Sequence, residues 1–426
     1  MQDLLSTLLD EFQEKLASTT QGLARESSFP VIDEKIKVAI GMRRVGKTYF
    51  LFQTIANFLF TKEITLQQVL YLNFEDDRLL PCSQEKFREL LEDFYRLYPD
   101  NHDRVCYLFL DEIQNVTDWA LVVRRFFDTK KVKIFLSGSS AKLLSKEIAT
   151  SLRGRSVVTE IWPFSFKEYI QRHNIAIPQA LFSDKTRDLM MQSLKAYINE
   201  GGFPEVQGLL IGDRRQILQD YVELVIVKDI IERYRITSIS LIKYMIQTLI
   251  KNPATGFSIN KFSKDIKSQG LSGAKNTISD YLNHIEDAYL TFSVPLFSES
   301  IRKVESNPKK IYVIDTGLIK AFSFSFSQNW GHLFENLIFL DLKRKGHKIF
   351  YYLTHARYEV DFLVEDRLGE KKLYQVVWDA SDLQTMEREM RALKIAEDEL
   401  GIKGELITVE TYLRGVWAEL SPNPLP

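Results

Sequence analysis

The sequence has few of the residues on which metal and disulfide modules depend. Among 426 residues there are two cysteines, Cys82 and Cys106, and six histidines, and no CxxC spacing occurs. A disulfide scaffold or a zinc module therefore lacks the side chains that would build it. Two unpaired thiols fit a reducing compartment, so we expect a cytoplasmic location.

Long apolar runs and a net charge are also absent. No 18 apolar residues occur together, so we expect no membrane span and no membrane partner. The first 16 residues lack a basic start followed by an apolar run, so no secretory signal is expected. The 56 basic residues nearly cancel the 57 acidic ones. This balance excludes a surface that binds nucleic acid over its whole area, and any such contact must be local.

The composition is that of a globular protein, with 45% apolar and 27% charged residues. At about 150 residues per domain, the length predicts two to four domains. The N-terminus carries the apolar stripe of an amphipathic helix, which either docks on the body or binds a partner: Leu4, Leu5, Leu8, Leu9, Phe12 and Leu16.

Short apolar β-rich runs alternate with helical stretches up to Ile161. This pattern predicts an α/β fold, a parallel sheet covered by helices on both sides with strands buried on both faces. The runs are Lys37–Ile40, Val69–Phe74, Val105–Leu110, Val132–Leu136 and Ser156–Ile161. From Pro163 to about residue 235 the sequence predicts helix with one break, at residues 201–204.

The next segment has the order of a winged helix. Residues 258–270 and 272–287 predict two helices, each preceded by a serine that could cap it. Strand-like residues 289–297 and 310–314 follow, around a charged loop at 301–309. The residues from Asp315 on predict an α+β module, with a helix near 334–344 and strands at 349–353, 358–364 and 373–378.

Residues Gly41–Thr48, GMRRVGKT, fit the phosphate loop GxxxxGK[ST], after a strand and at a helix start. Its backbone N–H groups and the helix N-terminus would surround a phosphate. Lys47 would neutralise the oxygens of the β- and γ-phosphates, and the Thr48 hydroxyl would ligate Mg²⁺. We expect nucleotide contacts from Gly41, Arg43, Arg44, Val45, Gly46, Lys47, Thr48 and Tyr49; a turn of purely structural role is the alternative.

A second motif delivers two carboxylates to the end of a buried strand. Asp111 and Glu112 end the run YLFLDE, at the strand edge where open α/β sheets bind ligands. Asp111 would hold Mg²⁺ through water, and Glu112 would orient and polarise the attacking water. We therefore expect hydrolysis of the bound nucleotide and not binding alone.

Three further residues complete the expected site, each with an alternative. Ser139 could sense the γ-phosphate or simply cap a helix. Asn73 could hydrogen-bond Glu112 and gate it, although its acidic neighbours also suit a solvated turn. Arg155, with Arg153 as second choice, could act as an arginine finger on a neighbouring subunit or lie on the surface as an ordinary arginine.

Taken together, these motifs resemble the prokaryotic AAA+ ATPases that pair an archaeal-type ATPase core with a C-terminal domain of unknown function. The resemblance rests on GMRRVGKT, YLNFEDDRL, YLFLDEIQNV, FLSGSS, LRGR, WPFSFKEY, GGFPEV, KKIYVIDTG (309–317) and YEVDF (358–362). It implies ATP binding and hydrolysis, a helical lid, a winged helix and a nuclease-like terminal fold of the restriction-endonuclease type.

We expect five segments: an N-terminal helix (1–30), a P-loop AAA+ core (31–165), a helical lid (166–235), a winged helix (236–314) and a nuclease-like α+β domain (315–426). The expected function is Mg²⁺-dependent ATP hydrolysis that moves these parts against a DNA or protein partner, in a homo-oligomer. A nucleotide-dependent signalling switch and an ATP-dependent nuclease are the alternatives.

The winged helix offers a local DNA contact. Residues 256–314 hold eight basic and six acidic residues, a small excess. Lys275 and Asn276 open the second helix, whose first turn would read bases, and Arg302 and Lys303 would lie on the wing near phosphates. A winged helix that packs against protein is the alternative.

Glu335, Glu359 and Asp361 resemble the metal-binding acids of restriction-endonuclease-like folds. Glu359 and Asp361 should share one face of a strand, with Val360 and Phe362 on the other. A nuclease of that class needs a lysine on the next strand, and this chain has Val377 there. Lys371 and Lys372, expected to precede that strand, do not replace it. The sequence therefore favours a domain that does not cut, with an active nuclease as the alternative.

Overall fold

The computed structural model describes residues 2–19, 22–139, 152, 154–178, 182–323 and 329–420. The chain divides into two compact units, Met1–Ile161 and Trp162–Pro426. Each unit is described by itself.

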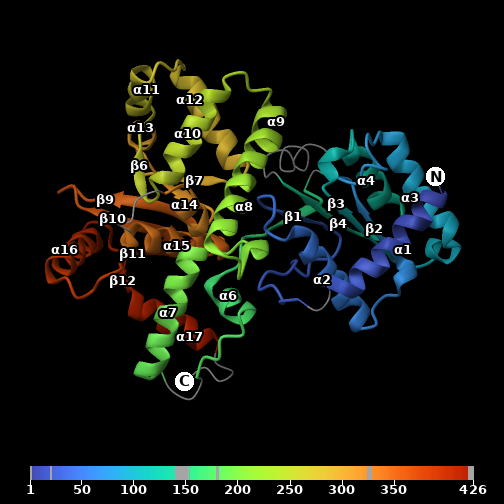
Figure 1. The fold of residues 1–426 in the computed structure, drawn as a ribbon, viewed down its shortest axis with the longest axis horizontal. Coiled ribbons are helices and arrows are strands. Elements are labelled where there is room, and N and C mark those ends of the chain that lie inside the picture. The colour runs from blue at the N-terminus through green and yellow to red at the C-terminus, as the bar shows by residue number, and fades with distance from the viewer. Residues whose placement is uncertain are drawn as a thin grey trace. The chain divides into compact units, whose positions relative to one another are not determined.

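A parallel sheet of five strands organises the first unit, in the order β2-β3-β4-β1-β5 (Figure 1). All neighbouring strands pair in parallel. The strands are β1 (Ile36–Ile40), β2 (Val69–Asn73), β3 (Cys106–Asp111), β4 (Val132–Gly138) and β5 (Ser156–Glu160). The predicted parallel α/β sheet is confirmed, but burial on both faces is wrong for β5. This edge strand is partly exposed along its length.

Helices and short turns connect these strands. The helices are α1 (Gln2–Thr19), α2 (Lys47–Phe60), α3 (Gln84–Leu97) and α4 (Trp119–Thr129), and the turns are η1 (Leu66–Gln68), η2 (Pro99–His102) and η3 (Ile113–Asn115). The docked interpretation of the N-terminal helix is confirmed. Phe12 and Leu16 of α1 lie in one apolar cluster with residues of α2, β2 and β3. The Phe12 ring lies 5.9 Å from that of Phe52 and 5.3 Å from that of Tyr71.

The second unit begins with helices. They are α6 (Phe166–Arg172), α7 (Asp184–Glu200), η5 (Pro204–Val206), α8 (Ile211–Leu224), η6 (Val225–Ile231), α9 (Glu232–Tyr234) and α10 (Ile239–Lys251). A single break at residues 201–204 was expected. A second break follows α6, where His173 ends the helix and Ser183 caps the next by accepting the N–H of Thr186. The segment η6 is a π-helix inside the helix that runs from α8 to α9.

A small antiparallel sheet in the order β6-β8-β7 follows, with α10, α11 and α12 gathered around it (Figure 1). Its elements are β6 (Thr255–Phe257), α11 (Ile259–Ser268), α12 (Lys275–Asp287), β7 (Thr291–Val294), α13 (Ile301–Ser306) and β8 (Lys309–Val313). The expected loop at 301–309 is wrong, because residues 301–306 form α13. Ser300 caps this helix by accepting the N–H of Lys303.

The C-terminal elements form a four-stranded sheet in the order β12-β11-β10-β9. They are α14 (Thr316–Phe322), α15 (Trp330–Arg344), β9 (Lys348–Leu353), β10 (Glu359–Glu365), β11 (Lys371–Val377), α16 (Leu383–Leu400), β12 (Gly404–Thr408) and α17 (Val409–Leu420). The helix α16 packs Leu393 and Ala396 against Val360 and Leu363 of β10. Among the described residues, no helix is long and apolar enough to cross a membrane.

Candidate functional site

The loop between β1 and α2 has the backbone that GMRRVGKT requires. A Cβ atom on Gly41 would lie 2.2 Å from the carbonyl oxygen of Ile161, so only glycine fits there. Gly46 has φ of 94°, in the left-handed region, where it precedes the first residue of α2. These two glycines let the loop turn tightly into the helix N-terminus.

Lys47 lies at the start of α2 with only 5% of its surface exposed. Its Nζ donates to the carbonyl oxygens of Gly41 and Met42 at 3.3 and 3.2 Å. The same atom lies 3.3 Å from Oε1 of Glu112. The two predicted catalytic residues therefore meet at the phosphate loop.

Asp111 is fully buried at the end of β3 and accepts several hydrogen bonds. Its Oδ2 accepts from the Thr48 hydroxyl at 2.6 Å and from the Tyr71 hydroxyl at 2.9 Å, and its Oδ1 accepts from Ser137. Burial and the neighbouring Glu112 raise the pKa of Asp111. A hydroxyl beside a carboxylate is an oxygen donor set that suits Mg²⁺, so Thr48 and Asp111 fit the metal role expected of them.

Both carboxylate oxygens of Glu112 have partners. Oε1 faces Lys47, and Oε2 accepts from Nε2 of Gln114 at 2.5 Å. Burial alone would raise the pKa of Glu112, but the charges of Lys47 and Arg43 outweigh it and hold the pKa below its ordinary value. The backbone N–H of Glu112, which has φ of 52°, donates to Oγ of Ser137 at 3.0 Å.

Gln114 and Ser137, which the sequence analysis did not single out, hydrogen-bond the carboxylate pair Asp111 and Glu112. Asn73 takes the turn position that is the alternative to a bond with Glu112: its Oδ1 accepts the backbone N–H of Glu75 at 3.0 Å, and Gln114 donates to Glu112. Ser137 contacts both carboxylate residues, whereas Ser139, two positions on, is buried after the end of β4. The signal for Ser137 was present, because FLSGSS contains it at the strand end.

The other predicted loop residues take different positions. Arg43 forms an ion pair with Glu75, and Arg44 is exposed with φ of 68°. Val45 is buried, and its carbonyl oxygen accepts from Arg25 at 3.0 Å. Tyr49 lies in the first turn of α2.

Arg155 lies just before β5, with its side chain about one-third exposed. Its Nε lies 3.1 Å from a carboxylate oxygen of Asp128, on α4. The alternative arginine, Arg153, lies outside the described residues, as do residues 140–151.

The helix–hairpin segment (residues 255–313) presents two of its four predicted DNA contacts where expected. Lys275 and Asn276 are exposed in the first turn of α12. The serine cap expected at Ser272 is wrong, because Ala274 precedes the helix and supplies no side-chain cap. Arg302 and Lys303 are exposed, but on α13 and not on a wing loop.

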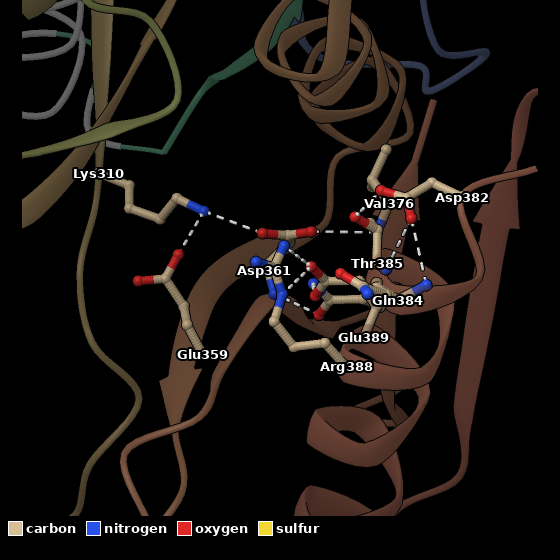
Figure 2. Close-up of polar contacts among 10 residues, drawn as sticks. Lys310, Glu359, Asp361, Val376, Asp382, Gln384, Thr385, Arg388 and Glu389 are labelled. Atoms are coloured by element: carbon tan, nitrogen blue, oxygen red, sulfur yellow. Dashed lines mark hydrogen bonds and ion pairs between the residues drawn. The ribbon is translucent and has the colours of Figure 1, made fainter. Parts of the chain in front are cut away.

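The predicted acids of the last domain converge on a lysine that the sequence did not single out. Nζ of Lys310, on β8, lies 2.6 Å from Glu335, 2.9 Å from Glu359 and 3.1 Å from Asp361. Figure 2 shows this side chain extended toward the two acids of β10. Burial and the neighbouring Asp361 raise the pKa of Glu335 to about 8.

Two details of that prediction are wrong. The pairing of β10 with β9 shifts register between Val360 and Leu363, so Val360 packs toward α16 while the Phe362 ring lies 5.5 Å from that of Tyr312. Lys371 and Lys372 do not precede β11 but begin it, paired with Glu365 and Val364 at the far end of β10 from Glu359.

Two family models match this chain, one over most of the first unit and one within the second unit. A family model described as an AAA domain matches residues 33–170, and a domain of unknown function (DUF8612) matches residues 191–329. The Walker-type ATPase PABY2304 of Pyrococcus abyssi, a solved structure, aligns over 68% of this chain and 91% of its own, with 13% identity and a TM-score of 0.44. The AAA match spans the parallel sheet and the phosphate loop, so this part of the chain is similar to an AAA domain.

Two relatives align over most of the chain. The uncharacterized protein MJ1544 of Methanocaldococcus jannaschii is 37% identical over 412 residues, which cover 95% of this chain and 88% of that protein. An uncharacterized protein of Haemophilus influenzae is 28% identical over 340 residues, 80% of this chain and 81% of that protein. The chain belongs to the same family as MJ1544.

Proposed function

We propose that this protein binds ATP and hydrolyses it with Mg²⁺, using Lys47, Thr48, Asp111 and Glu112. The observation that carries the proposal is the meeting of the Lys47 ammonium with Glu112, next to the bonded pair of Thr48 and Asp111. The arrangement joins a phosphate-binding cation, an oxygen donor set for a metal and a carboxylate base.

The roles follow from the contacts. Mg²⁺ held by Thr48 and Asp111 would neutralise charge on the phosphate oxygens. Lys47 holds its present partners at 3.2 to 3.3 Å, long for charged contacts, so its ammonium can turn to a phosphate. Glu112 then keeps Gln114 on one oxygen and has the other free to accept a proton from water.

Two variants test this proposal. Lys47→Ala should lose nucleotide binding, whereas Glu112→Gln should keep ATP bound and abolish turnover, because phosphate binding and water activation fail separately. Binding is measured with a fluorescent nucleotide and turnover by phosphate release. The exposed Glu89→Gln on α3 is the control and should match the wild type. A Glu112→Gln protein that hydrolyses ATP at the wild-type rate would contradict the assignment.

The output is proposed to be motion of the remaining segments in a homo-oligomer. The divisions remain those expected from the sequence: helix 1–30, core 31–165, lid 166–235, winged helix 236–314 and nuclease-like domain 315–426. A signalling switch is the alternative, and electron microscopy of the Glu112→Gln variant with ATP separates the two. A ring would support the motor, and a monomer would support the switch.

A DNA partner is proposed for the winged helix, supported by the exposed Lys275 and Asn276 at the first turn of α12. Duplex affinity should then fall steeply with salt. Replacing Lys275, Arg302 and Lys303 together should lower that slope by about one unit per lost phosphate contact.

The matched control for this test replaces Lys261, Lys264 and Lys267, three exposed lysines of α11. The control should keep the wild-type slope. No binding at low salt to duplex, fork or single strand would assign the segment to protein contacts. Neither result bears on ATP hydrolysis, which is measured separately.

A further inference from the structure

The resemblance to restriction-endonuclease-like folds implies a metal centre at Glu335, Glu359 and Asp361. The contacts of these residues test whether a metal fits. An ammonium group has three N–H donors. Nζ of Lys310 has three carboxylate neighbours within 3.1 Å, so every donor has an acceptor.

The other atoms around this centre are also engaged. The second oxygen of Asp361 accepts the backbone N–H of Val376 at 3.0 Å (Figure 2). Gln375, on the neighbouring strand, accepts the N–H of Asp361 with its oxygen and donates to Glu389 of α16 at 2.6 Å. Within the described ranges, no three His, Cys, Asp or Glu side chains are arranged to hold a metal ion. The residues present therefore do not fit a metal.

Lys310 is not a mobile surface side chain that happens to reach the acids. Only 3% of its surface is exposed, and the next inward residue of its strand, Tyr312, donates its hydroxyl to Glu335 at 2.7 Å. Two further hydrogen bonds join the last domain to the helix–hairpin segment. Tyr351 of β9 donates its N–H to the carbonyl oxygen of Pro295 and its hydroxyl to that of Pro308. Withdrawal of Lys310 would leave buried carboxylates without a cation.

We infer that the Lys310 ammonium is the permanent cation of this centre, in the place that a divalent metal takes in nuclease-like folds. It joins β8 of the helix–hairpin segment to β10 and α15 of the last domain. The centre is thus an internal junction that works without metal, and a reaction that needs a metal held by Asp361 is closed to it. This inference is independent of ATP hydrolysis.

The test compares Lys310→Met with Lys309→Met, the preceding residue of the same strand. The full-length protein is unfolded thermally without nucleotide, in EDTA and in Mn²⁺. Lys310→Met should lower the unfolding temperature by roughly 10 °C, because it leaves an uncompensated buried charge. The wild type and Asp361→Asn should respond alike to Mn²⁺, because the residues around Lys310 do not fit a metal. Lys309→Met should match the wild type.

Three results would overturn the inference. They are an unfolding temperature of Lys310→Met equal to that of the wild type, a Mn²⁺-dependent rise in the wild type that Asp361→Asn lacks, and cleavage of plasmid or single strands that Asp361→Asn loses and Lys47→Ala keeps. If Lys310→Met does not fold, bound Mn²⁺ is counted in the wild type and in Glu359→Gln, which changes a half-exposed carboxylate. Equal numbers support the inference, and an extra ion in the wild type contradicts it.

Discussion

Two lysines of this protein are almost fully buried beside carboxylates, and they differ in what holds them. Lys47, 5% exposed, has two carbonyl oxygens and one carboxylate at 3.2 to 3.3 Å. Lys310, 3% exposed, has three carboxylates at 2.6 to 3.1 Å. Contacts of the first kind are long and mostly to neutral carbonyl oxygens, so they are readily exchanged for a phosphate, whereas those of the second kind are shorter and pair the ammonium with three carboxylates. Burial of a lysine therefore does not by itself indicate a binding site; the partners decide.

Arginine at each position separates the two roles. Lys47→Arg should cut ATP turnover by at least about 10²-fold, because the planar guanidinium cannot take the place of a point charge inside the loop. Lys310→Arg should leave turnover within about twofold but lower the unfolding temperature by several degrees, since overpacking a buried site is destabilising. Loss of turnover in both variants would break the distinction. Phosphate release and thermal unfolding are the measurements.

Arg155 extends the comparison to a cation with one carboxylate partner and an exposed side. If it acts on a neighbouring subunit, Arg155→Ala should cost about 10³-fold in turnover. Mixing it with Lys47→Ala should restore part of the activity, because one kind of mixed interface then has both groups.

Arg124 and Asp128 supply the controls for Arg155. Arg124 lies 3.7 Å from the same Asp128, so Arg124→Ala removes an equivalent ion pair and should leave turnover unchanged. Asp128→Ala should also keep turnover, because it removes only the partner of Arg155 within the chain. A loss of equal size in Asp128→Ala would show that Arg155 acts through α4 of its own subunit.

The phosphate-loop residues could be predicted because their geometry is local. A strand, a glycine turn and a helix start place Lys47 and Thr48 within a few residues, and parallel pairing brings the end of β3 beside them. The same reasoning missed Gln114, since an amide two residues from Glu112 is also an ordinary turn residue.

The helix α13 was missed for another reason. Ser300 is a usable signal for a helix start, but the following charges and Pro308 favoured a loop.

The acid centre could be predicted only in part, for a reason of chain distance. Glu359 and Asp361 were found from their strand spacing, but Lys310 lies 49 and 51 residues before them. The expected lysine position was on the strand after the acids, where Val377 stands. Only the packing of β8 near β10 brings an ammonium there, and no periodicity in one sequence reports such a contact. The shifted register of β10 is likewise a tertiary feature.

Asp315 is the contrasting case of a buried carboxyl that accepts hydrogen bonds from backbone N–H groups. It accepts from Gly202 at 2.6 Å and from Leu318 at 3.1 Å. Burial raises its pKa from 3.8 to about 6. The folded state thus binds the proton more tightly than the unfolded state. The resulting stabilisation is complete below the unfolded pKa and is lost as the pH rises through about 6.

Asp315→Asn, which does not titrate, makes this loss measurable. The free energy of unfolding of the wild type, taken relative to Asp315→Asn, should fall by about 2 kcal/mol between about pH 4.5 and about pH 7.5. Urea unfolding at each pH gives the difference, and Asp213→Asn, an exposed change on α8, should show no such trend. A difference that is flat with pH would mean that the backbone N–H groups keep Asp315 ionised.

Gln114 gives the smallest expected effect and tests the neutral partner of Glu112. Its Nε2 donates to Glu112 at 2.5 Å, while its Oε1 is buried without a hydrogen-bond partner among the described residues. Gln114→Leu removes the bond to Glu112 together with an unsatisfied acceptor, so the stability of the fold should change little. Turnover should fall about tenfold because Glu112 loses the contact that orients it, while nucleotide affinity should stay at the wild-type value. Asn115→Leu, in the same turn, is the matched control. If Gln114→Leu lowered nucleotide affinity as much as turnover, Gln114 would be shaping the loop and not the position of the Glu112 carboxylate.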